Sequence, residues 1–319
     1  MNRIVLVGNG YDISSGHKTR YKDFIYSYLK SKIDESEESG GEYEDELISV
    51  TNTFGKSNYR LFEDVNSVQE ILDNHRVFVK PIHNTGLIND QPEGKSKQHV
   101  RITLKSQFFI ELLNLNNGNW KDIEGYYFKF LLRVFKSNHK EKQRLIENLN
   151  IEFEELKSQF IKYLKRINSI IDFKTTSNDK ATLLKRCLKP FEDQKDYYRF
   201  FESSSRDRNP RGSTLENIWF INFNYTKLLK KDLEVIPSNY YRHIYIHGNL
   251  QDSECIIFGY GDDTHSDYDS LEQSDNKSLL KHIKSFYYPN NREYINLLNY
   301  IESNVFDVYV IGHSLGLSD

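Results

Sequence analysis

Short apolar runs that end in glycine or polar residues recur near both ends of the chain. The first, Arg3-Ile-Val-Leu-Val-Gly8-Asn9-Gly10, has β-branched residues and runs into a glycine turn, which is typical of a strand buried on both faces. Such strands belong to parallel sheets, because crossover helices cover each side. We therefore predict a Rossmann-like, mostly parallel α/β sheet. Its later strands are expected at residues 217–222, 243–247, 254–259 and 307–312.

A helical period replaces this pattern in the middle of the chain. Apolar residues recur every three or four positions from Leu149 to Ile171, which predicts one long helix whose apolar stripe packs in a core. Further helices are expected at residues 21–32 and about 120–135. We predict that residues 1–30 and 214–319 form the α/β core, and that residues 31–213 form a large, mainly helical insertion between its first and second strands.

A run of acidic residues lies near the start of the predicted insertion. Residues 34–46 contain eight aspartates and glutamates around Gly40 and Gly41. A charge run of this kind is usually solvated. We expect an acidic loop at residues 34–46.

Composition limits the classes of partner. The chain has 319 residues, 38% hydrophobic content and a net charge of −3, so it can bury a large core and carries no strong field for nucleic acid or anionic membranes. Two separated cysteines, Cys187 and Cys255, fit a reducing compartment. The chain shows neither a secretion signal nor a membrane-spanning apolar segment. We expect a cytoplasmic protein that binds neither nucleic acid nor membranes.

Polar or glycine-containing residues follow each predicted strand. Because the carboxyl ends of parallel strands meet at one edge of a sheet, these tails are expected to line one crevice. Taken singly, Asn224 and Asp12 could cap helices, and His247 could be a buried histidine that bonds a carbonyl. Together the tails favour a ligand site. They are Gly8 to Asp12, Asn222 to Thr226, His247-Gly248, Gly259 to Asp262, and Gly312-His313-Ser314.

The residue types in these tails restrict the chemistry. The chain has no P-loop lysine pattern, no G-x-S-x-G turn and no cysteine beside a histidine, so phosphoryl and acyl transfer lack their usual groups. An asparagine and a histidine facing a glycosidic carbon can align a water or a ribose hydroxyl and accept its proton. No metal is expected, because His243 and His247 would lie about 13 Å apart on one strand.

Several segments together resemble the bacteriophage abortive-infection AbiH family. The resemblance covers nearly the whole chain in the same order. The segments are Gly8-Asn-Gly-Tyr-Asp12, His17-Lys-Thr19-Arg-Tyr21-Lys-Asp-Phe24, Trp120-Lys-Asp-Ile-Glu124, Asn222-Phe-Asn-Tyr-Thr226, His247-Gly248, Ile257-Phe-Gly-Tyr-Gly-Asp262 and Gly312-His-Ser-Leu-Gly316.

This family looks like a divergent relative of the sirtuin-like fold that binds or hydrolyses NAD. The resemblance implies that Asn224 orients the attacking water and the nicotinamide ribose, and that His247 is the general base. Thr226 and Asn9 depart from the sirtuin pattern, which has aspartate and alanine there. The implied NAD-binding residues are Gly8, Asn9, Gly10, Asp12, Thr19, Tyr21, Asn222, Thr226, Gly248, Gly259, Asp262, Gly312, His313 and Ser314.

The preferred hypothesis is a phage-defence effector that cleaves NAD to nicotinamide and ADP-ribose without a metal. The alternative is a non-catalytic nucleotide sensor or partner-binding module, which Thr226 in place of aspartate favours. A nuclease effector is a third hypothesis, which the near-neutral charge disfavours. We expect a homo-oligomer, because no helix follows the last strand to cover the sheet. A phage protein or another defence protein would be the trigger.

Overall fold

The computed structural model describes residues 2–53, 65–74, 77–81, 99–114, 123–171, 178–188, 217–260, 265–303 and 305–315. The chain divides into two compact units. Unit 1 comprises Met1–His17, Lys165–Ile257 and Phe286–Gly316, and unit 2 comprises Lys18–Leu164, Phe258–Ser285 and Leu317–Asp319. These limits differ from the predicted boundaries at residues 1–30, 31–213 and 214–319.

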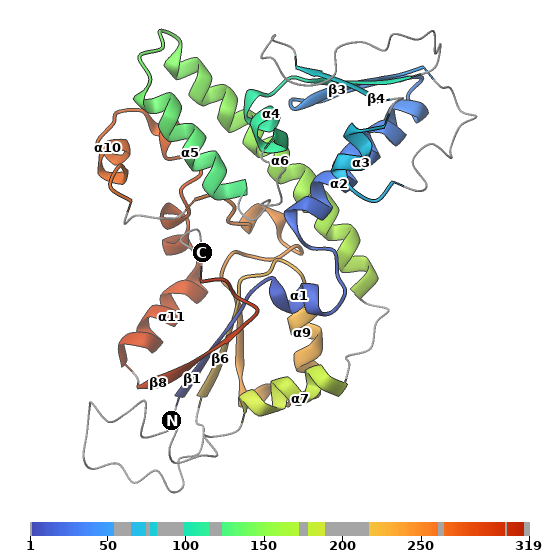
Figure 1. Cartoon of the computed structure of the whole chain (residues 1–319). Helices are drawn as coiled ribbons and strands as arrows, with labels where there is room; N and C mark the ends of the chain where they lie inside the picture. Colours follow the sequence, from blue (N-terminus) through green and yellow to red (C-terminus); the bar gives the residue numbers. More distant parts are fainter. Residues whose placement is uncertain are drawn as a thin grey trace, which may run out of the picture. The chain divides into compact units, whose positions relative to one another are not determined.

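Unit 1 contains a four-stranded sheet in the order β7-β6-β1-β8, with every neighbouring pair parallel (Figure 1). The predicted parallel sheet is thus confirmed, and so are the strands predicted at residues 217–222 and 307–312, within a residue. The strands are β1 (Asn2–Val7), β6 (Asn217–Asn222), β7 (Arg242–Tyr245) and β8 (Phe306–Ile311).

Side chains alternate between the two covered faces of this sheet. Val5 and Val7 of β1 pack with buried residues of α7 (Asn178–Cys187) and α9 (Leu228–Asp232). Ile4 lies on the opposite face, in a cluster with Leu297 and Tyr300 of α11 (Arg292–Ser303). Helix α11, which precedes the last strand, therefore covers part of one face of the sheet. The homo-oligomer stays a prediction.

The strand predicted at residues 254–259 is wrong. The short helical turn η3 (Ser253–Cys255) opens this segment, and an isolated bridge pairs Tyr260 with Ile283. The backbone N–H of Ile257 donates to His247 and that of Tyr260 donates to His282, so loops rather than a strand partner satisfy the segment. Its apolar residues are buried without joining a sheet.

Unit 2 contains a second four-stranded sheet, in the order β2-β3-β5-β4, which the hydrophobic pattern did not predict. β2 (Glu42–Glu44), β3 (Ile48–Asn52) and β5 (Val100–Leu104) pair antiparallel, and β4 (Val77–Pro81) pairs parallel with β5. The helices of this part of the chain are α2 (Tyr21–Glu38), α3 (Val68–Leu72), α4 (Gln107–Asn114), α5 (Ile123–Lys136), α6 (Lys142–Ile171) and α10 (Tyr268–Glu272).

The long helix predicted from the apolar stripe is confirmed as α6, whose stripe is buried from Leu149 to Leu164. Its last residues, from Lys165 onwards, count in unit 1. The remaining short elements are α1 (Gly10–Ser14) and the turns η1 (Leu233–Val235), η2 (Ser238–Tyr240), η4 (Lys277–Leu279), η5 (Lys284–Phe286) and η6 (Tyr288–Asn290). None of the described helices combines the length and apolar character that a bilayer crossing requires.

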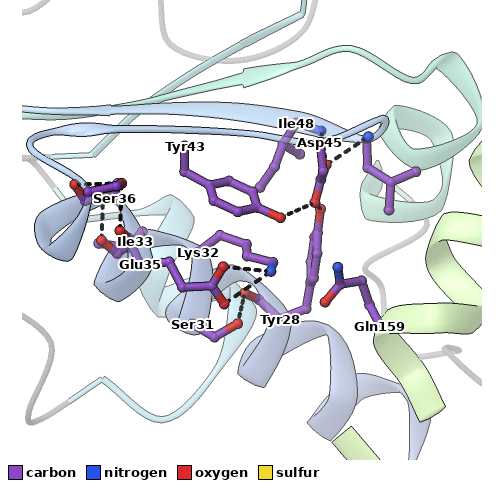
Figure 2. Close-up of polar contacts among 12 residues, drawn as sticks. Tyr28, Ser31, Lys32, Ile33, Glu35, Ser36, Tyr43, Asp45, Ile48 and Gln159 are labelled. Carbon is purple, nitrogen blue, oxygen red and sulfur yellow. Dashed lines mark hydrogen bonds and ion pairs between the residues drawn. The ribbon is translucent and has the colours of Figure 1, made fainter. Parts of the chain in front are cut away.

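The segment predicted to be an acidic loop is the end of α2 followed by β2. Most of its acidic side chains face solvent, whereas Lys32 and Ser36 of the same helix are buried. Figure 2 shows Asp45 accepting hydrogen bonds from the Tyr28 and Tyr43 hydroxyls at 2.7 and 2.9 Å. The half-buried Asp45 therefore connects the middle of α2 to the end of β2.

Candidate functional site

The carboxyl ends of the four parallel strands lie in register at one edge of the unit 1 sheet. Val7, the last residue of β1, is paired with Asn222 and with Ile311, and Asn222 is paired with Tyr245. The turns that follow β1, β6, β7 and β8 therefore start side by side. This confirms the predicted convergence for four of the five strand ends, residues 254–259 being the exception.

The glycine turns after β1 and β8 are in direct backbone contact. The N–H of Gly10 donates to the carbonyl of Gly312 at 2.8 Å. A Cβ placed on Gly8 would lie 2.5 Å from the Cα of His313, and one on Gly10 would lie 2.7 Å from the Cα of Gly312. Close approach of two backbones thus requires glycine here whether or not a nucleotide binds. Asn9, between the two glycines, is exposed.

Two asparagines connect the end of β6 to the β1 turn. The side-chain Nδ2 of Asn224 donates to the carbonyl of Gly8 at 3.1 Å, and its backbone N–H donates to Oδ1 of Asn222 at 3.0 Å. Both side chains are buried. The Nδ2 of Asn222 is buried with no hydrogen-bond partner among the described residues, a state that costs about 1–3 kcal/mol when no ligand or water accepts the bond.

A buried carboxylate lies in the same neighbourhood. Asp12, in α1, is 1% exposed, and its Oδ2 accepts a hydrogen bond from the hydroxyl of Thr226 at 2.6 Å. Burial, with the nearby Asp12 charge as a second cause, raises the pKa of Tyr245 at the end of β7 well above its usual value. The strand edge therefore holds an acidic side chain in a poorly solvated place.

His247 follows β7 and is enclosed by aromatic rings. Its side chain is 3% exposed. The ring centroids of Phe223 and Tyr225, the neighbours of Asn224 in sequence, lie 5.4 and 6.1 Å from the imidazole. Nε2 of His247 lies 3.0 Å from the hydroxyl of Tyr288. The residues on either side of Asn224 in sequence therefore pack beside the His247 ring, whereas the Asn224 side chain bonds the Gly8 carbonyl.

The turn after β8 contacts the aromatic residues around His247 through the ring of His313. The His313 imidazole lies 4.0 Å from the Phe223 ring, and its Nδ1 accepts a hydrogen bond from the N–H of Leu315. Ser314 is exposed.

Among the described residues, three of the predicted binding residues belong to unit 2. Thr19 is buried there. The Tyr21 hydroxyl and the Gly259 N–H both donate to the carboxylate of Glu124, at 3.4 and 2.9 Å, and Glu124 also pairs with the buried Lys284. Asp262 lies outside the described residues.

Sequence reasoning missed the aromatic residues around His247. Phe223 and Tyr225 alternate with Asn222 and Asn224 in the tail of β6. This alternation could have indicated that aromatic residues lie at the strand edge. The sequence could not have indicated Tyr288, because this residue lies among short turns 41 residues after His247. Among the described residues, no group of three histidine, cysteine or acidic side chains is placed to hold a metal ion.

Comparison with known proteins gives one family match. A family model described as bacteriophage abortive infection AbiH matches residues 4–319. The search of curated proteins found no match.

Proposed function

The chain belongs to the bacteriophage abortive infection AbiH family, and from this premise we propose that it is a defence effector that cleaves NAD at the bond between nicotinamide and ribose. The family membership indicates a role in abortive infection. The finer proposal rests on the strand edge of unit 1. The observation that carries it is that Asn224, His247 and the buried Asp12 follow the parallel strands β6, β7 and β1, whose carboxyl ends lie in register.

The strand order supports a nucleotide site at this edge. In chain order the parallel strands of unit 1 run third, second, first and fourth across the sheet. A Rossmann-like sheet has this order, and it binds its ligand beyond the carboxyl ends of the strands, where the order reverses. The reversal falls between β1 and β8, the strands that precede Gly8 and Gly312. A relationship to the sirtuin-like fold is part of the proposal.

The chemistry of the edge suits cleavage of an N-glycosidic bond. Departure of nicotinamide leaves positive charge on the ribose, and a fixed carboxylate in a poorly solvated place stabilises such charge. Asp12 provides that carboxylate. His247 accepts the proton of the attacking water, and Asn224 orients the water and the ribose. The unsatisfied Nδ2 of Asn222 can donate to an oxygen of the ligand.

A non-catalytic nucleotide sensor is the second candidate. The amide of Asn224 already bonds the Gly8 carbonyl, and Thr226 already bonds Asp12. Side chains that already hydrogen-bond within the protein form a rigid surface for binding. They therefore favour a nucleotide sensor over an enzyme whose side chains must bond the reacting groups.

Incubation of the purified protein with NAD, with detection of nicotinamide and ADP-ribose, separates the two functions. We expect turnover that falls by about 100-fold or more in Asn224→Ala and His247→Ala, since a positioned general base contributes about 10²–10⁴. His139→Ala, at an exposed histidine of unit 2, serves as the control and keeps full turnover.

Thermal stabilisation by NAD without product would favour the sensor. Equal turnover in the wild type and in both active-site variants would remove Asn224 and His247 from the mechanism. The absence of both turnover and stabilisation, with phage extract present, would contradict both functions.

A further inference from the structure

Strand β8 is an edge of the unit 1 sheet, and one of its faces exposes apolar side chains. Among the described residues, β1 is its only paired neighbour. Val308 and Val310 are 49% and 45% exposed, and the register pairs them with Ile4 and Leu6 of β1. Paired residues of a sheet point to the same face, so both valines lie on the face that α11 covers. That face is therefore buried at Ile4 and exposed at β8.

Helix α11 adds a second exposed apolar row beside this strand. The row consists of Ile295, Leu298 and Ile301, which are 40%, 37% and 39% exposed. Successive helical residues turn by about 100°, so Leu298 and Ile301 lie on one side of the buried Leu297. Glu293, which forms an ion pair with β7, lies on the other side. The row therefore faces β8, whose first residue, Phe306, stacks on Tyr300 of α11 at 6.4 Å.

The one charged side chain of β8 is already neutralised within the subunit. Asp307 accepts two hydrogen bonds from the guanidinium of Arg3 on β1. Edge strands that stay unpaired are commonly protected by proline or by an uncompensated charge such as lysine. The sequence of β8 from Phe306 to Ile311 contains neither. The outer edge of β8 is therefore suited to pair with another strand.

We propose that β8 and α11 form a two-fold interface with a second copy of this chain, in which the two β8 strands pair antiparallel. A two-fold interface requires a surface that matches itself after the rotation. With the axis at Tyr309, Val308 of each copy meets Val310 of the other. The exposed side chains of the two edge strands then cover each other, and the two sheets become one.

The apolar row of α11 has the same symmetry. It is centred on Leu298, so that Ile295 of each copy meets Ile301 of the other when the two helices pack antiparallel. Tyr309 lies three residues from the start of β8, about 10 Å along a strand. Leu298 lies five residues from the end of α11, about 8 Å along a helix. Because α11 leads directly into β8, one axis can pass close to both centres.

The charges at the two ends of α11 also match in this arrangement. Arg292 begins the helix, and Glu302 lies in its last turn; both are exposed. Glu293, at the same end as Arg292, is paired with Arg242. Antiparallel packing brings the positive end of one helix to the negative end of the other, whereas parallel packing would bring like charges together. Charge complementarity therefore favours a second copy in the antiparallel orientation.

Sedimentation of the purified full chain over a range of concentrations tests the interface. We expect a dimer, and a dissociation constant at least about 100-fold higher in Val310→Lys, which brings charge into the centre of the interface. Val235→Lys is the matched control, because this valine of η1 is 44% exposed and lies outside the proposed interface. It is expected to remain dimeric. Circular dichroism checks that both variants keep the fold.

Leu298→Cys gives a second readout that does not depend on loss of association. The variant is made with Cys255→Ser, which removes the exposed native thiol. Oxidation should then join two copies through a disulfide, since position 298 meets its own copy at the axis. Ile151→Cys in the same background is the control, because Ile151 is an exposed residue of α6 in unit 2. It should give no such cross-link.

Each outcome decides the proposal. A wild-type monomer at every concentration overturns it and leaves the surface to a different protein. A dimer that Val310→Lys leaves intact, or that Leu298→Cys does not cross-link, shows that the copies meet elsewhere and overturns it too. Dissociation by Val310→Lys together with the cross-link supports it. None of these measurements involves NAD, so this inference and the proposed function stand or fall separately.

Discussion

At the residue scale, Glu152 shows how burial and charge act on one side chain. It lies on α6, where its Oε2 accepts a hydrogen bond from the Ser106 hydroxyl at 2.6 Å. Ser106 also caps α4 through the N–H of Phe109. Burial, and to a lesser extent the Glu46 charge, raise the pKa of Glu152 to about 7, although the Ser106 bond acts in the opposite direction.

This shift predicts a pH-dependent effect of Glu152→Gln on stability. A carboxyl with a raised pKa in the folded state contributes stability that is complete below the unfolded pKa and is lost as pH rises through about 7. The glutamine variant mimics the neutral form, so we expect it to be more stable than the wild type at pH 8 by about 1–2 kcal/mol, and equal near pH 4.5. Urea unfolding at both pH values measures the difference.

Glu147→Gln, at an exposed position of the same helix, is the control and should change stability little at either pH. A stability gain of Glu152→Gln that is equal at both pH values would show that ionisation of the buried carboxyl is not its cause.

At the element scale, the edge strand β8 is tied to β1 by a buried ion pair. Arg3 is fully buried, and its guanidinium donates to both oxygens of Asp307 at 2.8 and 2.6 Å. The same guanidinium donates to the carbonyl of Cys187, the last residue of α7, and lies over the Tyr309 ring. One side chain thus connects two strands and a helix.

Removal of one partner of this pair should be costly, because it leaves a buried charge uncompensated. We expect Asp307→Asn to lower the free energy of unfolding by about 2–4 kcal/mol. The matched control is Glu293→Gln, which breaks the exposed pair between Arg242 of β7 and Glu293 of α11 at 3.1 Å and should cost about 0–1 kcal/mol. Equal losses in chemical denaturation would show that burial does not govern these pairs.

The strands and helices with strong periodicity could be predicted from sequence, and the rest could not. The patterns of apolar residues in β1, β6, β8 and α6 are enough to locate these elements. The segment at Ile256 to Phe258 has the same apolar character, but Ile257 bonds the His247 carbonyl and the Tyr225 hydroxyl rather than a neighbouring strand. The second sheet was missed because its strands are short and separated in the chain.

The candidate site was likewise predictable from sequence only in part. The carboxyl ends of parallel strands meet at one edge of a sheet, so the turns that contain Gly8, Asn224 and His247 could be predicted to start at the same edge. Tyr288 reaches His247 only through tertiary packing, and no local signal marks it. Tyr21 was assigned to the site by resemblance, and Gly259 was assigned to it also because it ends a predicted strand; both donate hydrogen bonds to Glu124 in unit 2.

At the scale of the whole molecule, buried tyrosine hydroxyls that donate to carboxylates occur in both compact units. Tyr11 donates to Asp232 at 2.8 Å in unit 1, and Tyr28 donates to Asp45 in unit 2. Burial first, and the neighbouring carboxylate second, raise the pKa of each hydroxyl well above its usual value. Folding therefore keeps these groups neutral.

Alkaline titration should consequently unfold both units. Because the pKa is raised on folding, the stabilising contribution is complete below about pH 10, the value of an unfolded tyrosine, and is lost as the pH rises further. We expect tyrosinate absorbance from the buried groups to rise together with the loss of the circular dichroism signal. Tyr28→Phe should weaken this pH dependence, and Tyr240→Phe, which is 59% exposed, should not. Ionisation of the buried groups while the signal stays native would contradict the argument.

The contact between the glycine turns after β1 and β8 changes how genetic results on this protein should be interpreted. A side chain at Gly8, Gly10 or Gly312 would enter the backbone of the opposite turn. A screen of random variants for lost phage protection will therefore score these positions as intolerant, whatever the protein binds. The intolerant positions found in such a screen therefore report whether the edge of the sheet can assemble. Substitutions that remove a single polar group from a side chain and leave the backbone in place are the ones that report chemistry.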